Sequence, residues 1–258
     1  MPLKIILLIS FLWISGLGLG GWLFLKSLRS LSYRLIFFGF CALTYWLCYT
    51  YIPCFSGGVV CSVKEKQELA LTFDDGPQEP YTSQVLDILK EENIHATFFV
   101  LGKYVQNHPD LIQRMIDEGH VVGNHGWSHT PLAFQGKNFI RHEIDSWEDV
   151  MRPFGLLPYK LFRASHGWKN PALVKILNEK KYRFIGWNVG VWDSDKPQKE
   201  VLMERLEGLS PGSIILLHDG DGDHEGGDRS QTVAVLPDLI HKYKKLGFQF
   251  VTIPEILK

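Results

Sequence analysis

Two short segments carry side chains that can bind a metal ion and activate water. Thr72–Pro77 has the sequence TFDDGP, and Asn124–His129 has the sequence NHGWSH. Three protein ligands with an open fourth position distinguish a catalytic zinc-type site from a closed structural one. One carboxylate and the two imidazoles can supply these ligands, and the second carboxylate can take a proton from water. The sequence therefore predicts a metal-dependent hydrolase.

Each segment by itself also has a purely structural explanation. Asp74–Pro77 contains Asp, Gly and Pro, which favour a turn after a strand. His125 and His129 are of a residue type that is common in polar loops. Their four-residue spacing is nevertheless typical of two-histidine metal motifs, although here it follows a predicted strand instead of lying within a helix. Their expected placement on one face with the two carboxylates favours a metal site.

The elements that position these side chains follow from the pattern after about Ser62. Short apolar runs alternate with amphipathic segments, which indicates parallel strands joined by right-handed helical crossovers. The predicted strands are Leu69–Phe73, Ala96–Val100, His120–Gly123, Leu161–Arg163, Phe184–Val189, Ser213–Leu217 and Phe248–Thr252. The predicted helices are Tyr81–Glu92, Pro109–Glu118, Asn138–Met151, Pro171–Lys180, Lys199–Glu207 and Thr232–Leu246. Seven strands are too few for an eight-stranded barrel, so we predict an α/β fold with an incomplete (β/α)7 barrel. An open doubly wound sheet is the alternative.

The candidate functional residues favour the barrel, because each lies at or just after the end of a predicted strand. They are Asp74, Asp75, His125, His129, Arg163, Asp193 and His218. Barrel enzymes build their active sites at the C-terminal ends of the strands. We therefore predict one catalytic domain over residues 62–258.

The first 61 residues differ from the rest and predict a membrane anchor. Ile5–Leu25 and Leu35–Ile52 are almost unbroken apolar runs. Each is long enough to cross a bilayer core of roughly 30 Å as a helix. A cleaved signal peptide has a shorter apolar region and a small-residue cleavage site. We expect two transmembrane helices, with a cleaved or re-entrant first segment as the alternative.

Charge and cysteine placement bear on the compartment and on the partners. The connection between the apolar runs carries Lys26, Arg29 and Arg34, which favours a cytoplasmic loop and an extracytoplasmic domain, although an equal number of lysines flanks the other side. Cys54 and Cys61 either pair in an oxidising compartment or remain free thiols. Beyond the apolar runs the chain is acidic overall and has no basic stripe. This distribution argues against nucleic acid as a partner.

The segment from about Leu69 to Thr252 resembles the polysaccharide deacetylases of carbohydrate esterase family 4. That family has five short motifs, and the chain has a counterpart of each in the family's order. Thr72–Pro77 and His125–His129 match the first two motifs without a change, and Ile215–His218 closely matches the fifth.

The third and fourth motifs depart from the family pattern. Arg163–Gly167 has the sequence RASHG, where the family more often has two prolines and an aromatic residue between Arg and Gly. Asp193 matches the acid of the fourth motif, but Ser194 replaces the Trp that helps to enclose the acetyl group. Trp192 and Trp168 are candidates to replace that Trp in the wall of the acyl pocket.

The resemblance implies a role for each of these residues. The expected metal ligands are Asp75, His125 and His129. Asp74 is expected to act as the general base, with Arg163 as its partner. His218 is expected to act as the general acid, with Asp193 as its partner. A structural ion pair is the alternative for Arg163 and Asp193. The cofactor is expected to be a divalent metal, with zinc first and cobalt, nickel or manganese also compatible with this donor set.

Four further residues are expected to contact the substrate. Backbone N–H groups near His166 are candidates for an oxyanion hole, and Leu216 is expected to line the pocket for the acyl methyl group. Trp127 and Trp168 are expected to stack on sugar faces, with packing at the rim as the alternative.

These features together predict removal of N-acetyl groups from the amino sugars of a cell-envelope glycan or oligosaccharide at a membrane surface. One alternative keeps the site but changes the bond, for example a formyl group on a lipid-linked sugar or an O-acetyl ester. The other is a non-catalytic protein that binds glycan or metal on the same scaffold.

Overall fold

The computed structural model describes residues 31–52, 54–55, 58–63, 67–155 and 159–258. The chain divides into two units between Thr50 and Tyr51. Helix α3 (Leu31–Tyr51) lies where we predicted the second membrane helix. Within the described ranges, however, no helix is both long enough and apolar enough to span a bilayer. The membrane-spanning part of that prediction is therefore unsupported. The first predicted membrane helix, Ile5–Leu25, lies outside the described residues.

The second unit is built on a curled parallel sheet. Its described strands are β1 (Glu68–Asp74), β2 (Thr97–Val100), β3 (Val121–Asn124), β4 (Leu161–Phe162), β5 (Arg183–Phe184), β6 (Val189–Gly190), β7 (Ser213–His218) and β8 (Gln249–Phe250). They are arranged in the order β5-β4-β3-β2-β1-β7-β6, with β8 beside the start of β1. The central strand β1 pairs with β7 along Leu69–Asp74, and this register sets Asp74 directly beside His218.

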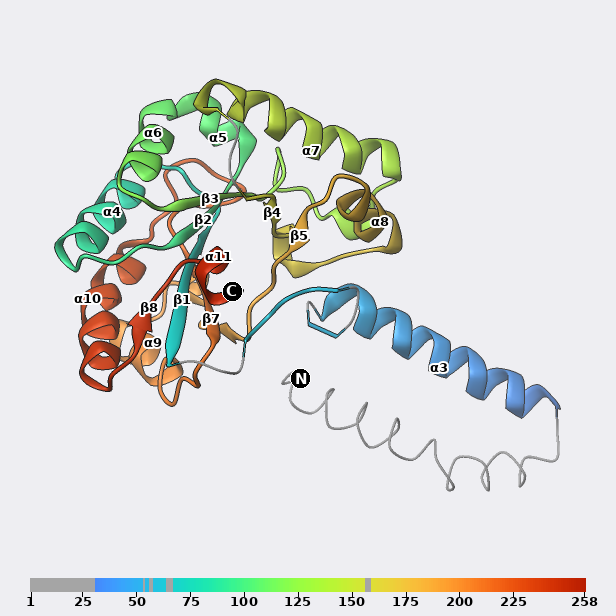
Figure 1. Cartoon of the computed structure of the whole chain (residues 1–258). Coiled ribbons are helices and arrows are strands. Elements are labelled where there is room, and N and C mark those ends of the chain that lie inside the picture. Colours follow the sequence, from blue (N-terminus) through green and yellow to red (C-terminus); the bar gives the residue numbers. More distant parts are fainter. Residues whose placement is uncertain (1–30, 53, 56–57, 64–66, 156–158) are drawn as a thin grey trace. The chain divides into compact units, whose positions relative to one another are not determined.

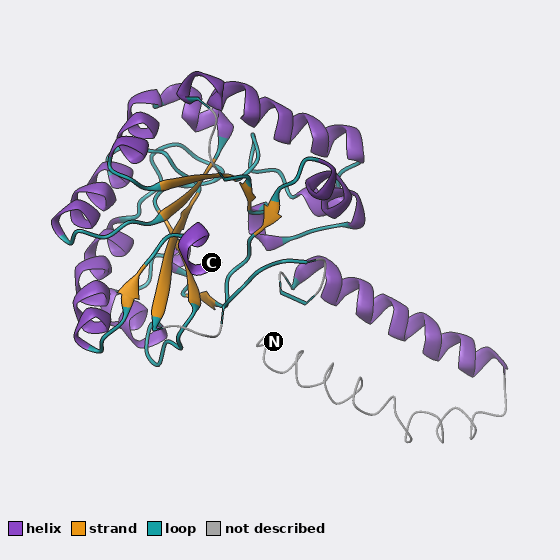
Figure 2. Cartoon of the chain, in the orientation of Figure 1, coloured by secondary structure: helices purple, strands orange, loops and turns teal. Residues whose placement is uncertain are grey.

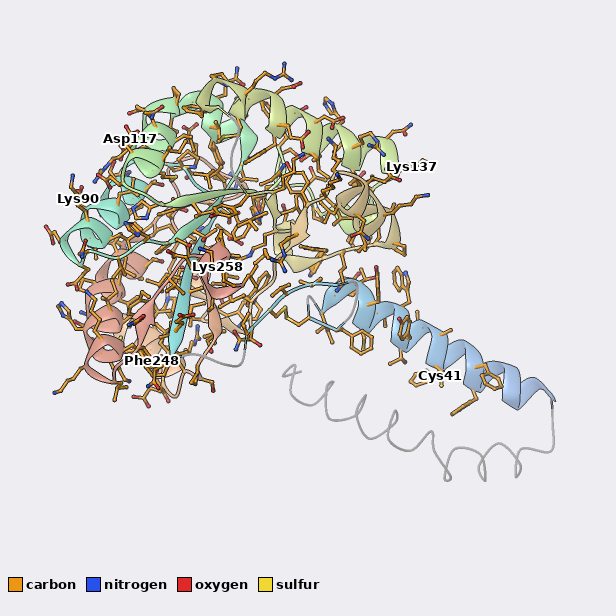
Figure 3. All side chains as sticks on the ribbon, in the orientation of Figure 1. Cys41, Lys90, Asp117, Lys137, Phe248 and Lys258 are labelled. Carbon is orange, nitrogen blue, oxygen red and sulfur yellow. A yellow bond between two sulfur atoms is a disulfide. The ribbon has the colours of Figure 1, made fainter. Side chains whose placement is uncertain are left out.

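Helices follow one another around the outer side of this sheet (Figures 1 and 2). They are α4 (Tyr81–Glu91), α5 (Gly102–Asn107), α6 (Pro109–Asp117), α7 (Lys137–Met151), α8 (Pro171–Glu179), α9 (Lys199–Arg205) and α10 (Ser230–Lys245), while α11 (Ile253–Ile256) is a short C-terminal turn. Charged side chains such as Lys90, Asp117 and Lys137 point away from the sheet (Figure 3). The amphipathic pattern of the sequence thus corresponds to one buried and one exposed face on each helix.

The two faces of the sheet have separate cores. On the outer face, Leu69 and Leu71 pack among the apolar residues of α4 and α10. On the inner face, Ala70 packs with Ile253 and Ile256 of α11. Because Ala70 lies early in β1, α11 fills the interior at the N-terminal ends of the strands and leaves the C-terminal ends free for a site. The long helices cover only the outer face, which excludes the open doubly wound alternative and confirms the incomplete barrel.

The predicted fifth strand, Phe184–Val189, is divided in two. Its start pairs with β4 as β5, and its end pairs with β7 as β6. Between them, Gly186 donates its N–H to the carbonyl of Val60, and Ile185 forms an isolated bridge with the same residue. The division follows from this long-range contact, which a local pattern does not reveal. The ladder is interrupted between β5 and β6, and this is where the barrel is incomplete.

Cys54 and Cys61 are joined by a disulfide. The sequence had left pairing and free thiols equally open. The bond closes a short loop at the start of the second unit, next to the segment around Val60 that contacts the divided strand.

Candidate metal centre and active site

Three buried side chains meet at the C-terminal ends of β1 and β3. Asp75 follows β1, and His125 and His129 follow β3. The Nε2 atoms of His125 and His129 lie 3.3 Å and 3.2 Å from Asp75 Oδ1. One donor atom from each residue lies within 4.8 Å of the other two. The structure therefore brings the three predicted ligands to one point.

Hydrogen bonds orient both imidazoles toward that point. His125 Nδ1 lies 3.0 Å from the carbonyl oxygen of Arg163, and because a carbonyl can only accept, this nitrogen carries the proton. His129 Nδ1 pairs in the same way with Asp223 Oδ1 at 3.2 Å. Each Nε2 is thereby left with its lone pair facing Asp75. Such outer contacts fix the tautomer and orientation of metal-binding histidines.

The chemistry of Asp75 fits a cation at this position. Its Oδ1 is buried and has no hydrogen-bond partner among the described residues. An unsatisfied buried acceptor is costly, and a divalent cation would remove that cost. Burial alone would raise the pKa of Asp75, but positive charge at the neighbouring imidazoles holds that pKa well below its usual range, and a divalent cation between them would supply the same charge. One carboxylate and two imidazoles suit zinc and related divalent metals.

Asp74 lies beside these ligands and is held by a buried arginine. Arg163 Nη1 donates to Asp74 Oδ1 at 2.7 Å and to Thr72 Oγ1 at 2.8 Å. Its other terminal nitrogen donates to the carbonyl of Gly186 at 2.9 Å. The guanidinium also lies 4.1 Å from the ring centroid of Phe99, a cation–π contact. Arg163 is thus fixed on several sides, and it holds the Asp74 carboxylate in one orientation.

His218 ends β7 on the other side of β1 and is held by Asp193. His218 Nδ1 and its backbone N–H each lie 2.8 Å from a carboxylate oxygen of Asp193. Thr232 donates to the same carboxylate at 2.7 Å. Burial lowers the pKa of His218, but attraction to Asp193 outweighs burial and raises that pKa to about 9. With that pKa, His218 carries a proton at neutral pH that it can donate.

A loop after β7, residues 219–228, lies over the metal centre. Lys103 Nζ donates to the carbonyl of Gly222 at 2.6 Å, and Tyr104 donates to the carbonyl of Asp221 at 2.9 Å. The backbone of Gly222 packs on the His129 ring so closely that an added Cβ would lie 2.2 Å from Nδ1. Asp223 and Gly222 position His129, and neither was predicted from the sequence. A run of Asp and Gly after the sixth predicted strand was the available signal.

Glu143 also supports the site and was not predicted from the sequence. It lies on the buried face of α7 and accepts hydrogen bonds from the N–H groups of Trp127 and Ser128, each at 2.9 Å. The Ser128 hydroxyl donates to its other oxygen at 2.8 Å. Glu143 therefore holds the loop between the two histidine ligands. A carboxylate on the apolar face of a predicted helix was the signal that could have identified it.

The predicted substrate-contacting residues differ in their surroundings. His166 is exposed, and its ring centroid lies 4.6 Å from that of His129. Leu216 is buried on β7. The indole of Trp127 packs on Gly102, where an added Cβ would lie 2.5 Å from the ring, as in the rim-packing alternative. Trp168 contacts the ring of His166 at 5.1 Å. Trp192, beside the altered fourth motif, is 63% exposed.

The sequence of this chain is similar to those of known proteins. A family model for polysaccharide deacetylase matches residues 62–201. A peptidoglycan-N-acetylglucosamine deacetylase of Bacillus cereus is 35% identical over 210 residues, which cover 79% of this chain and 94% of that protein. A chitooligosaccharide deacetylase of Rhizobium leguminosarum bv. trifolii is 33% identical over 199 residues, covering 74% and 92% respectively.

A solved structure supports the same conclusion. The crystal structure of a peptidoglycan N-acetylglucosamine deacetylase superposes with a TM-score of 0.72 at 33% identity. The match covers 78% of this chain and 92% of that one. The fold, the paired motifs and these relatives agree, and the chain belongs to the polysaccharide deacetylases of carbohydrate esterase family 4.

Proposed function

We propose that this protein removes N-acetyl groups from the amino sugars of a cell-envelope glycan, using a divalent metal held by Asp75, His125 and His129. The observation that carries the proposal is the placement of Asp74 and His218. They lie side by side on β1 and β7, next to the ligand cluster, and each is held by its own buried partner. The relatives named above act on peptidoglycan and chitooligosaccharide. Both are glycans that contain N-acetylated amino sugars.

The side chains of the site divide the proton transfers of amide hydrolysis between them. When bound, the metal supplies a Lewis acid for the acyl carbonyl and acidifies water. Asp74 accepts the proton of the attacking water as the new C–O bond forms, and Arg163 keeps its carboxylate aimed at that proton. His218 gives its Nε2 proton to the departing amine as the C–N bond breaks. The products are acetate and a free amino sugar. Positioned acid and base groups each contribute roughly 10²–10⁴-fold to such rates.

The identity of the acyl group that is removed is a more specific part of the proposed function. Leu216 supplies an apolar wall, and acetyl is the simplest group that needs one. Ser194 stands where the family has a Trp, and Trp192 is largely exposed, which favours a second candidate with a different acyl group or an O-acetyl ester. The reported relatives are named for peptidoglycan and chitooligosaccharide, and this supports a glycan substrate over the lipid-linked sugar of our sequence-based alternative.

We also propose that the catalytic domain works outside the cytoplasm. The Cys54–Cys61 disulfide supports this location, because such bonds persist mainly in oxidising compartments. A peptidoglycan substrate, as in the relatives, would lie in the same compartment.

Amine release by the full-length chain tests the proposed activity. N-acetylglucosamine oligomers and purified peptidoglycan are incubated with enzyme, with and without a chelator, and then with added zinc or cobalt. We expect release that the chelator abolishes and the metal restores, and release by Asp74→Asn that is lower by roughly 10²–10⁴-fold. Parallel assays with N-formyl and O-acetyl substrates test the acyl group. Metal-loaded, folded protein that releases nothing from any of these substrates would refute an enzymatic role.

A further inference from the structure

Aromatic rings from three distant segments meet beside the metal centre. The ring centroid of Trp168 lies 5.1 Å from that of Tyr51 and 5.9 Å from that of Phe134, both in edge-to-face geometry. Tyr51 and Phe134 lie 6.2 Å apart. Tyr51 is 37% exposed and Phe134 is 55% exposed. The three rings form an aromatic platform with a surface open to solvent.

This platform is continuous with the site through one histidine. The His166 ring lies 5.1 Å from Trp168 and 4.6 Å from the ring of His129, which is a metal ligand in our assignment. A row of rings therefore runs from the ligand cluster to Tyr51 and Phe134. A ligand that extends beyond the reacting group along this row meets ring surfaces at each step.

Buried polar residues fix the platform in place. Lys169 is fully buried, and its Nζ donates to the carbonyl of Ile52, beside Tyr51, at 2.8 Å. The next residue, Asn170, holds the turn that carries Phe134. Its side-chain amide lies 3.1 Å from each of three carbonyl oxygens, those of Leu132, Ala133 and Gln135. Three consecutive residues thus supply one ring and anchor the segments that carry the other two.

We propose that Tyr51, Phe134 and Trp168 bind the sugar units that flank the one being deacetylated, so that the enzyme prefers longer glycans. The proposal rests on the proposed function and names its substrate as an oligomer or polymer. The C–H faces of amino sugars are apolar and flat enough to stack on aromatic rings, while their hydroxyls stay in water. A fixed platform binds more tightly than a mobile one, because less freedom is lost on binding. Continuity with the ligand cluster favours a glycan over a lipid surface as the occupant.

Chain-length dependence of the kinetics tests the platform. KM and kcat are measured for a chitin disaccharide and a pentasaccharide with the full-length wild type and with Tyr51→Ala, Phe134→Ala and Trp168→Ala. We expect KM for the pentasaccharide to rise about fivefold for each ring lost, with a smaller rise for the disaccharide and little change in kcat. Tyr159→Ala is the matched control, since Tyr159 is 41% exposed but lies in another surface depression. Trp168→Phe should restore part of the affinity.

Two further measurements distinguish a failure of the proposed aromatic platform from a failure of the proposed deacetylase activity. Binding of the pentasaccharide to Asp74→Asn, measured by calorimetry with and without Phe134→Ala, reports on the platform even if no turnover is found. Sedimentation with phosphatidylglycerol vesicles reports on a lipid surface. Unchanged pentasaccharide KM and binding in all three ring variants would overturn the proposal. Loss of vesicle binding with unchanged pentasaccharide affinity would replace it with a membrane contact.

Discussion

Removing the charge of Asp193 should move the alkaline limit of activity. Asp193 is buried, and its carboxylate receives the Nδ1–H and the backbone N–H of His218 as well as the Thr232 hydroxyl. It raises the pKa of His218 to about 9 against the burial that would lower it. In Asp193→Asn the attraction to Asp193 disappears, while burial and the smaller attraction to Asp75 and Asp74 remain, so the pKa should fall toward the ordinary value of about 6.5.

The sign and size of the effect follow from these values. The acid form of His218 is present below its pKa and is lost as the pH rises through it. At about pH 8, a histidine with a pKa of about 9 is roughly nine-tenths protonated, whereas one at about 6.5 is roughly 3% protonated. The fraction of competent enzyme therefore falls about 30-fold.

The assay is the pH profile of kcat for deacetylation between about pH 6 and pH 10. We expect the alkaline limb of Asp193→Asn to shift by more than two pH units toward acid. Thr232→Val is the control, because it removes one hydrogen bond to Asp193 but leaves the charge. Thr232→Val should lower thermal stability slightly and leave the alkaline limb of the kcat profile at the same pH. If the alkaline limbs of wild type and Asp193→Asn coincide, the conclusion that Asp193 keeps His218 protonated is refuted.

Three other substitutions test separate parts of the site. Asp74→Asn should reduce kcat by roughly 10²–10⁴-fold and leave zinc affinity by calorimetry nearly unchanged, because Asp74 lies outside the ligand set; a large loss of zinc would contradict that assignment. Gly222→Ala should weaken zinc binding roughly 10–100-fold by displacing His129, whereas Gly136→Ala, with open space around it, should not. Glu143→Ala should lower the free energy of unfolding by roughly 1–3 kcal/mol and also weaken zinc binding, since it frees the loop between the histidines. A stability loss with unchanged zinc affinity would limit Glu143 to a structural role.

The sequence by itself contained the family, the fold class and the identities of the three candidate metal ligands and of their neighbours Asp74 and His218. Alternating apolar runs and amphipathic segments identified the strands, with the fifth appearing as one run, and the six long helices to within about two residues. These patterns are local, because burial on one face repeats with the period of the element itself. Each of the two paired motifs is also a short continuous segment of the chain. For this reason Asp75, His125 and His129 were recognisable before any fold was known.

The tertiary structure decided which distant residues contact the site residues and where some of the strands begin and end. The division of the fifth strand depends on Val60, and the orientation of His129 depends on Asp223, each far away in the chain. Glu143 appears in the sequence as a helix residue, and only the packing of α7 against the histidine loop makes it part of the site. Hydrogen bonds and ring contacts between distant segments have no period along the chain. They depend on which surfaces the folded backbone brings together, and only the structure shows them.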